Sequence, residues 1–253
     1  MEEAVNLMGI AIAFAMNGIA FFAAIIMFWL INVDSPESES NVDSNPGIIS
    51  LIREGFSHVF ENKTLIYLLF VASVSHFLVE GPLFVGIPVL AHSRFPEGAV
   101  AFGIIMSGLG VGMLLGIIGA GTLPKPNPKH LGRLLMMLLS LSGIGLMFVG
   151  FMYNTYSVAF TVMIMGAAQG YVVIQYSTWM QIRTPAKLLG RVLSLMMFAS
   201  VGLVPVSQAL CGALIKLSVQ WLFLGAGIIM TLINLLVSLS PAVRDMGLEI
   251  TKD

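Results

Sequence analysis

Charged residues are scarce in this sequence of 253 residues: Asp, Glu, Lys and Arg make up 10% of it, against 57% hydrophobic residues. A soluble domain carries roughly 25% charged residues. The mean hydropathy is +0.94 and the formal net charge is −1. This balance excludes a soluble globular enzyme and a disordered chain, and it offers no positive field for nucleic acid. We therefore expect the lipid bilayer to surround most of the chain.

Residues that build catalytic and metal sites are also scarce. The single cysteine, Cys211, cannot form an internal disulfide, and no Cys/His cluster has the spacing of a zinc site. No G-x-x-x-x-G-K-[ST] phosphate loop occurs, so transport would be driven by a gradient rather than by ATP. The G-x-S-x-G motif of serine hydrolases is absent too. These absences predict a protein that is not an enzyme and that holds no cofactor or metal.

Long apolar runs dominate what remains. A helix needs about 20 apolar residues to cross the hydrocarbon core of a bilayer. Seven stretches qualify, at 8–31, 64–91, 99–121, 131–152, 156–181, 190–215 and 218–239. The second is long and contains Gly81-Pro82, which predicts a tilt or a kink because proline removes a backbone hydrogen bond. The sequence thus predicts an all-α membrane protein with seven transmembrane helices.

Lysine and arginine placement predicts the orientation. If the ends of the spans alternate between the two sides, one side collects ten basic residues and the other only Arg94 and Lys216. The ten are Arg53, Lys63, Lys125, Lys129, Arg133, Arg183, Lys187, Arg191, Arg244 and Lys252. Because cytoplasmic loops are enriched in Lys and Arg, we expect a multi-pass protein of the cell membrane with its N-terminus outside and its C-terminus in the cytoplasm.

The spans are unevenly distributed along the chain. Residues 1–31 hold one span, and residues 32–62 form a polar cytoplasmic linker. Within the linker, residues 47–60 have apolar residues at helical spacing and predict an amphipathic helix on the membrane surface. Six spans follow in residues 63–240, and residues 241–253 form a cytoplasmic tail.

Several motifs accompany this layout. The second span contains Gly81-Pro82 and Pro88, and the third span contains the glycine-rich run 103–116. The Gly132-Arg133 pair follows the third span. Residues 185–194 have the pattern P-x-x-x-x-G-R-V-x-S, which includes Gly190 and Arg191, and Pro205 is expected to kink the span that follows. Layout and motifs together resemble the major facilitator superfamily, most closely its drug and siderophore efflux branch. The aspartate of the superfamily's cytoplasmic loop signature is absent before Gly132-Arg133.

The resemblance implies a fold and a function. Residues 1–31 would be the last span of the first half of such a transporter, and the six later spans would be its second half. The implied function is secondary active, proton-coupled efflux of a small molecule. One alternative is a truncated or split-gene fragment that does not transport alone, partnered by a missing N-terminal half or by a second copy. A second, more remote alternative is a seven-span receptor or sensor.

Glu80 is the candidate for proton coupling. An ionisable residue inside a span is costly unless it faces a cavity or a partner. His76 lies four residues earlier on the same helical face, so the two side chains can pair. The alternative is that the pair lies near the outer end of a tilted span and meets headgroup water.

Polar side chains mark the span at 156–181. Tyr171 and Gln175 lie four residues apart on one face, and Gln169 lies nearby. We predict that these three line a cavity for the substrate, with hydrogen bonding between helices as the alternative. Seventeen methionines occur in the chain and suit either a pliable substrate surface or a lipid-facing one.

Glycines and one proline are candidates for helix packing or gating. Gly108, Gly112 and Gly116 form two overlapping GxxxG motifs, which let helices approach closely. The resemblance implies a sliding contact between the two halves here, and tight static packing is the alternative. Pro205 is the fourth candidate residue for helix packing or gating, because a proline bends a helix.

Overall fold

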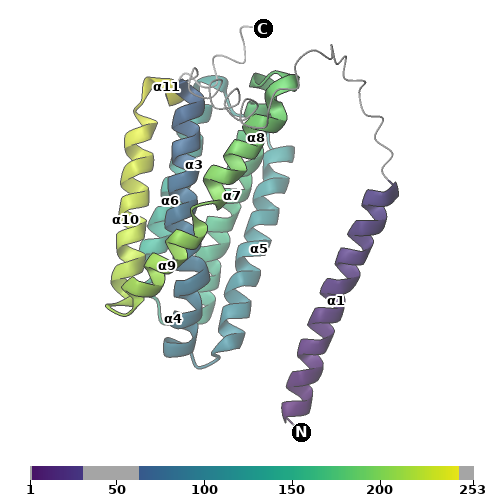
Figure 1. Cartoon of the computed structure of the whole chain (residues 1–253). Helices are drawn as coiled ribbons and strands as arrows, with labels where there is room; N and C mark the ends of the chain where they lie inside the picture. Colours follow the sequence, from purple (N-terminus) through teal and green to yellow (C-terminus); the bar gives the residue numbers. More distant parts are fainter. Residues whose placement is uncertain (1, 31–62, 245–253) are drawn as a thin grey trace. The chain divides into compact units, whose positions relative to one another are not determined.

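The computed structural model describes residues 2–30 and 63–244, and all regular elements within these ranges are helices (Figure 1). The chain divides into two compact units, Met1–Asn45 and Pro46–Asp253. The predicted linker 32–62, with its amphipathic helix 47–60, and the last part of the predicted tail, residues 245–253, lie outside the described residues.

The first unit contains the helix α1 (Glu2–Leu30), which has 29 residues. Its segment Phe14–Leu30 is apolar, and large side chains such as Phe14, Phe22 and Trp29 are exposed. A helix that is apolar on all sides requires an apolar surrounding. The role of α1 as a seventh span remains a prediction.

The second unit contains six segments that are long and apolar enough to cross a membrane, counted over the described residues. Its helices are α3 (Lys63–Gly81), η1 (Pro82–Gly86), α4 (Ile87–Arg94), α5 (Ala99–Thr122), η2 (Pro128–His130), α6 (Leu131–Val149), α7 (Thr155–Arg183), α8 (Ala186–Val201), α9 (Val204–Ile215), α10 (Val219–Ser238) and α11 (Pro241–Arg244). Each of the predicted spans between 64 and 239 corresponds to one of these segments, two of which are interrupted.

The first interruption lies in the segment Leu65–Arg94, at the predicted kink. Pro82 has no amide proton to donate to the preceding turn. The chain instead forms the π-helical segment η1, which closes when the amide of Ile87 donates to the carbonyl of Pro82. Gly86 then lets α10 approach, because a Cβ at this position would stand 2.8 Å from the ring of Phe223.

The second interruption separates α8 from α9. Gly202 and Leu203 lie between the two helices, and Pro205 lies in the first turn of α9. Figure 1 shows α8 and α9 as successive parts of one path along the bundle, and both contact α3. At the α3–α9 contact, Ser207 donates a hydrogen bond to the carbonyl of Phe77.

Glycines hold the longest helices together. A Cβ at Gly108, Gly112 or Gly116 of α5 would overlap a backbone carbonyl of α7, and Gly170 of α7 stands in the same relation to Met113 of α5. The helices α5 and α7 are therefore in backbone-to-backbone contact. The helices α6 and α10 meet in the same way through Gly143 and Gly227.

The two ends of the bundle differ in charge. The starts of α6 and α8 and the ends of α5 and α7 lie together at one end, which carries Lys125, Lys129, Arg133, Arg183 and Arg191 (Figure 1). Arg94 and Lys216 lie at the opposite end, at the last residue of α4 and the end of α9. This separation agrees with the alternation used to predict orientation, although the orientation itself remains a prediction.

Arg94 joins two loops at its end of the bundle. Its guanidinium donates to the carbonyls of Gly150 and Met152, at 2.8 and 3.1 Å, and lies 4.5 Å from the ring centroid of Tyr153. In the same region, Thr155 donates to a carboxylate oxygen of Glu97 at 2.9 Å. The loops before α5 and before α7 are thereby tied together.

The predicted tail, residues 241–253, begins with a short helix. Residues Pro241–Arg244 form α11 and pack against α3 and α6. Gly132 permits this contact, because a Cβ there would overlap the carbonyl oxygen of Val243. Val243 is fully buried as a result.

Candidate functional site: a cavity inside the six-helix unit

A cavity of about 430 Å³ lies among α3, α6, α7, α8 and α10. Pockets that hold drug-sized ligands range over about 300–1,000 Å³. The wall from α3 runs from Leu68 to Val79, and the wall from α7 runs from Met165 to Met180. Both runs repeat at helical spacing, so each helix gives the cavity one face.

The lining is apolar and soft. Among the described residues that form it, none is Asp, Glu, Lys or Arg. Six are methionines: Met136, Met165, Met180, Met196, Met197 and Met230. Thioether side chains are flexible and polarisable, so such a wall can adapt to ligands of different shape.

A few polar groups interrupt this lining. Ser75 and His76 come from α3, and Gln169 and Tyr176 come from α7. The phenol of Tyr176 donates to the sulfur of Met196 at 3.5 Å. Ser75 is only 7% exposed, and its Oγ has no hydrogen-bond partner in the described part of the chain.

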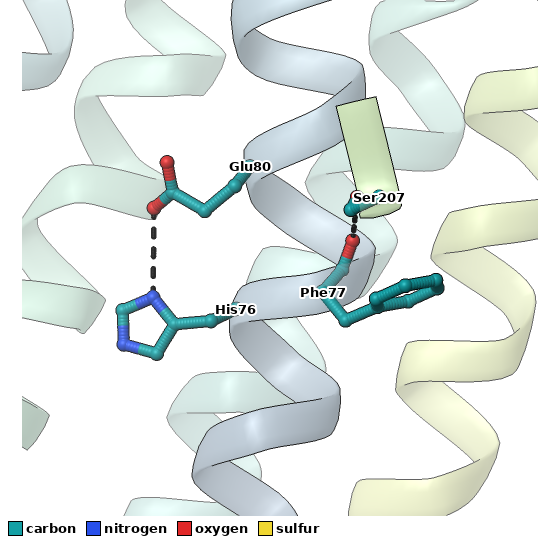
Figure 2. A network of polar contacts seen from close by, with 4 residues as sticks. All are labelled: His76, Phe77, Glu80 and Ser207. Atoms are coloured by element: carbon teal, nitrogen blue, oxygen red, sulfur yellow. Dashed lines mark hydrogen bonds and ion pairs between the residues drawn. The ribbon is translucent and has the colours of Figure 1, made fainter. Parts of the chain in front are cut away.

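The His76–Glu80 pair forms as the spacing predicted. Nδ1 of His76 lies 3.5 Å from Oε1 of Glu80, and both side chains are half-buried. Figure 2 shows the pair on one side of α3 and the contact between Ser207 and Phe77 on another. Glu80 lies near the middle of the segment Leu65–Arg94, and η1 begins two residues later. His76 lines the cavity, whereas Glu80 is not among the lining residues.

Of the three residues predicted to line the cavity, the structure places only Gln169 there. Tyr171 and Gln175 lie outside it, and Gln175 lines a second pocket near Lys125 instead. A helix turns by 100° per residue, so Gln169 and Tyr176, seven apart, share a face, while Tyr171 is rotated by about 200° from Gln169. The spacing from Gln169 to Tyr176 was the sequence signal that would have found Tyr176.

The other predicted residues serve packing or lie at the surface. Gly108, Gly112 and Gly116 contact α7 inside the six-helix unit, and their role in a sliding contact remains a prediction. Pro205 is exposed at the start of α9, Arg133 is exposed, Gly190 faces open space and Arg191 is half-exposed.

The family of the chain follows from comparison with known proteins. The sequence profile of the Major Facilitator Superfamily matches residues 4–206, which is more than half of the chain. The chain therefore belongs to this superfamily, whose members are transmembrane transporters, and it is a multi-pass membrane protein. No curated protein and no solved structure matched it.

Proposed function

We propose that the chain is part of a secondary active exporter that couples the efflux of a small molecule to protons. The observation that carries this proposal is a carboxyl–imidazole pair in the middle of an apolar segment, one member of which lines an otherwise uncharged cavity. An intramembrane carboxyl group is costly, and such groups mark proton relays in transporters. His76 gives Glu80 a partner that faces the substrate space.

The direction and the energy source rest on the sequence. The glycine-rich run 103–116 and the pattern at 185–194 are similar to the efflux branch of the superfamily, and the absence of a phosphate loop favours a gradient as the energy source. Alternating access would come from rocking of the six-helix unit against a second helical bundle.

The test is transport in membrane vesicles. Ethidium, Nile red and carboxyfluorescein serve as probes, with and without an imposed pH gradient. We expect Glu80→Gln, which keeps shape and removes the charge, to abolish uphill movement while downhill exchange continues. Glu97→Gln is the matched control, because Glu97 lies in a loop and binds Thr155.

Two results would contradict the proposal. Undiminished gradient-driven movement in Glu80→Gln would exclude proton coupling through this residue. If the wild-type chain moves none of the three probes, either alone or in membranes of its native host that would supply the second helical bundle, the efflux function fails.

A further inference from the structure

Among the buried serines that the structure describes, Ser75 alone has a hydroxyl group without a hydrogen-bond partner. A serine inside a helix normally satisfies its hydroxyl by donating to the carbonyl four residues earlier. Ser73, Ser140 and Ser194 all do so, at 2.8 Å in each case. Ser75 does not, although it is 7% exposed and lines the cavity. A buried hydroxyl without a hydrogen-bond partner costs free energy. A ligand that hydrogen-bonds to this hydroxyl removes that cost and therefore binds more tightly.

Gln169 provides a second free group on another wall. It is half-buried, lines the cavity from α7, and its amide makes no hydrogen bond with the residues that the structure describes. An amide both donates and accepts, and a hydroxyl does the same, so each of the two can hydrogen-bond to a carbonyl or hydroxyl oxygen of a ligand.

The remaining lining limits what else a ligand can carry. Because the described lining holds no Asp, Glu, Lys or Arg, and its His76 is already paired with Glu80, an ionised ligand would lose its hydration without gaining a free counter-charge. The methionine side chains of the lining instead favour ligands with apolar surface, and they can adapt to ligands of different shape.

Resting on the proposed transport function, we propose that the cavity selects uncharged, largely apolar molecules bearing one carbonyl or hydroxyl oxygen, and that Ser75 and Gln169 are its specificity-determining residues. The volume of about 430 Å³ suits a single molecule at the small end of the drug-sized range.

The test is equilibrium binding to the full chain in lipid nanodiscs, with empty nanodiscs subtracted. Pyrene, 1-acetylpyrene and pyrene-1-sulfonate share one ring system and differ in a single group. Binding is followed by energy transfer from tryptophan, since the buried Trp179 adjoins the lining residue Met180. We expect the sulfonate to bind at least about tenfold more weakly than the ketone.

The variants assign the selectivity to residues. Ser75→Ala and Gln169→Leu should each weaken 1-acetylpyrene by about threefold to tenfold, the effect of one neutral hydrogen bond. Pyrene binding should stay unchanged, which also shows that the variants are folded. Ser73→Ala and Gln175→Leu are the matched controls on α3 and α7, and both should bind all three probes as the wild type does.

Outcomes for this inference and for the transport function are separable. If the anionic probe binds as tightly as the ketone, or if both variants bind 1-acetylpyrene normally, the ligand class is wrong even where vesicles export the uncharged Nile red. If the binding pattern holds but a pH gradient moves no 1-acetylpyrene in vesicles, prepared with the chain alone or from its native host, the ligand class stands and the efflux proposal fails.

Discussion

The contact between α5 and α7 gives the sharpest test of the fold, through Gly112. A Cβ at Gly112 would overlap the carbonyl oxygen of Met163 and stand 2.7 Å from its carbonyl carbon. Both are backbone atoms, so no side-chain rotation relieves the clash, and α7 must move away. Gly110 lies on the exposed face of the same helix, and a Cβ there meets nothing within 4 Å.

The expected cost follows from these two environments. Overpacking costs about 1–3 kcal/mol, and replacing glycine by alanine in a helix gains at most about 1 kcal/mol. Gly112→Ala should therefore lose about 1–2 kcal/mol, whereas Gly110→Ala should lose nothing or gain slightly. At about 2–4 °C per kcal/mol for a domain of this size, the two variants should differ in Tm by about 2–12 °C.

The assay uses the single cysteine of the sequence. Cys211 is 6% exposed in the folded unit, so a maleimide dye that fluoresces on reaction with a thiol reports its exposure as the protein is heated in detergent. Equal melting temperatures for Gly112→Ala and Gly110→Ala would refute the backbone contact between α5 and α7. A higher melting temperature for Gly112→Ala than for the wild type would refute it more strongly.

Two further predictions concern the ends of the bundle. Arg94→Ala removes two hydrogen bonds and a cation–π contact, so it should lower the free energy of unfolding by about 1–3 kcal/mol in the same assay. Lys216→Ala, at the exposed end of α9, is the control and should have little effect. Equal melting curves for the two variants would contradict the contact between Arg94 and the loop before α7. Gly132→Ala should displace α11, because the added Cβ would overlap the carbonyl oxygen of Val243, and it should speed the digestion of the C-terminus by carboxypeptidase. Gly190→Ala is the control, because a Cβ at Gly190 meets no neighbour and digestion should not change. Unchanged digestion of Gly132→Ala would show that α11 is held by other contacts.

The sequence predicted the elements of the fold well because each lipid-crossing segment needs its own long apolar run. The six segments between 64 and 239 follow from length and hydropathy, and the interruption after Gly81 follows from the missing amide proton of Pro82. The docking of α11 was not predicted, because Pro241–Arg244 is too short to show a periodic pattern and depends on the space above Gly132.

The candidate site was predictable only in part, because apolar composition hides which face of a membrane helix points inward. The His76–Glu80 pair needed only spacing along one helix, so it was found. The cavity needs the rotation of α7, which is fixed by contacts of Gly166 and Gly170 with α5, and no hydrophobic stripe reveals that rotation when all sides are apolar. The sequence therefore pointed to Tyr171 and Gln175, whereas Tyr176 lines the cavity of the six-helix unit.

The contacts divide the six-helix unit into parts that resist bending and parts that allow it. In the pairs α5–α7 and α6–α10, glycines bring backbone against backbone, and no side chain there can rearrange to absorb a shift. The two interrupted segments, at η1 and at Gly202–Leu203, lack regular backbone hydrogen bonding, and helices bend at such points. The free hydroxyl of Ser75 and the His76–Glu80 pair both lie on α3, directly before η1. A ligand that binds Ser75 therefore contacts the helix that also carries the proposed proton site. We expect ligand binding and protonation of the His76–Glu80 pair to be coupled through bending at η1.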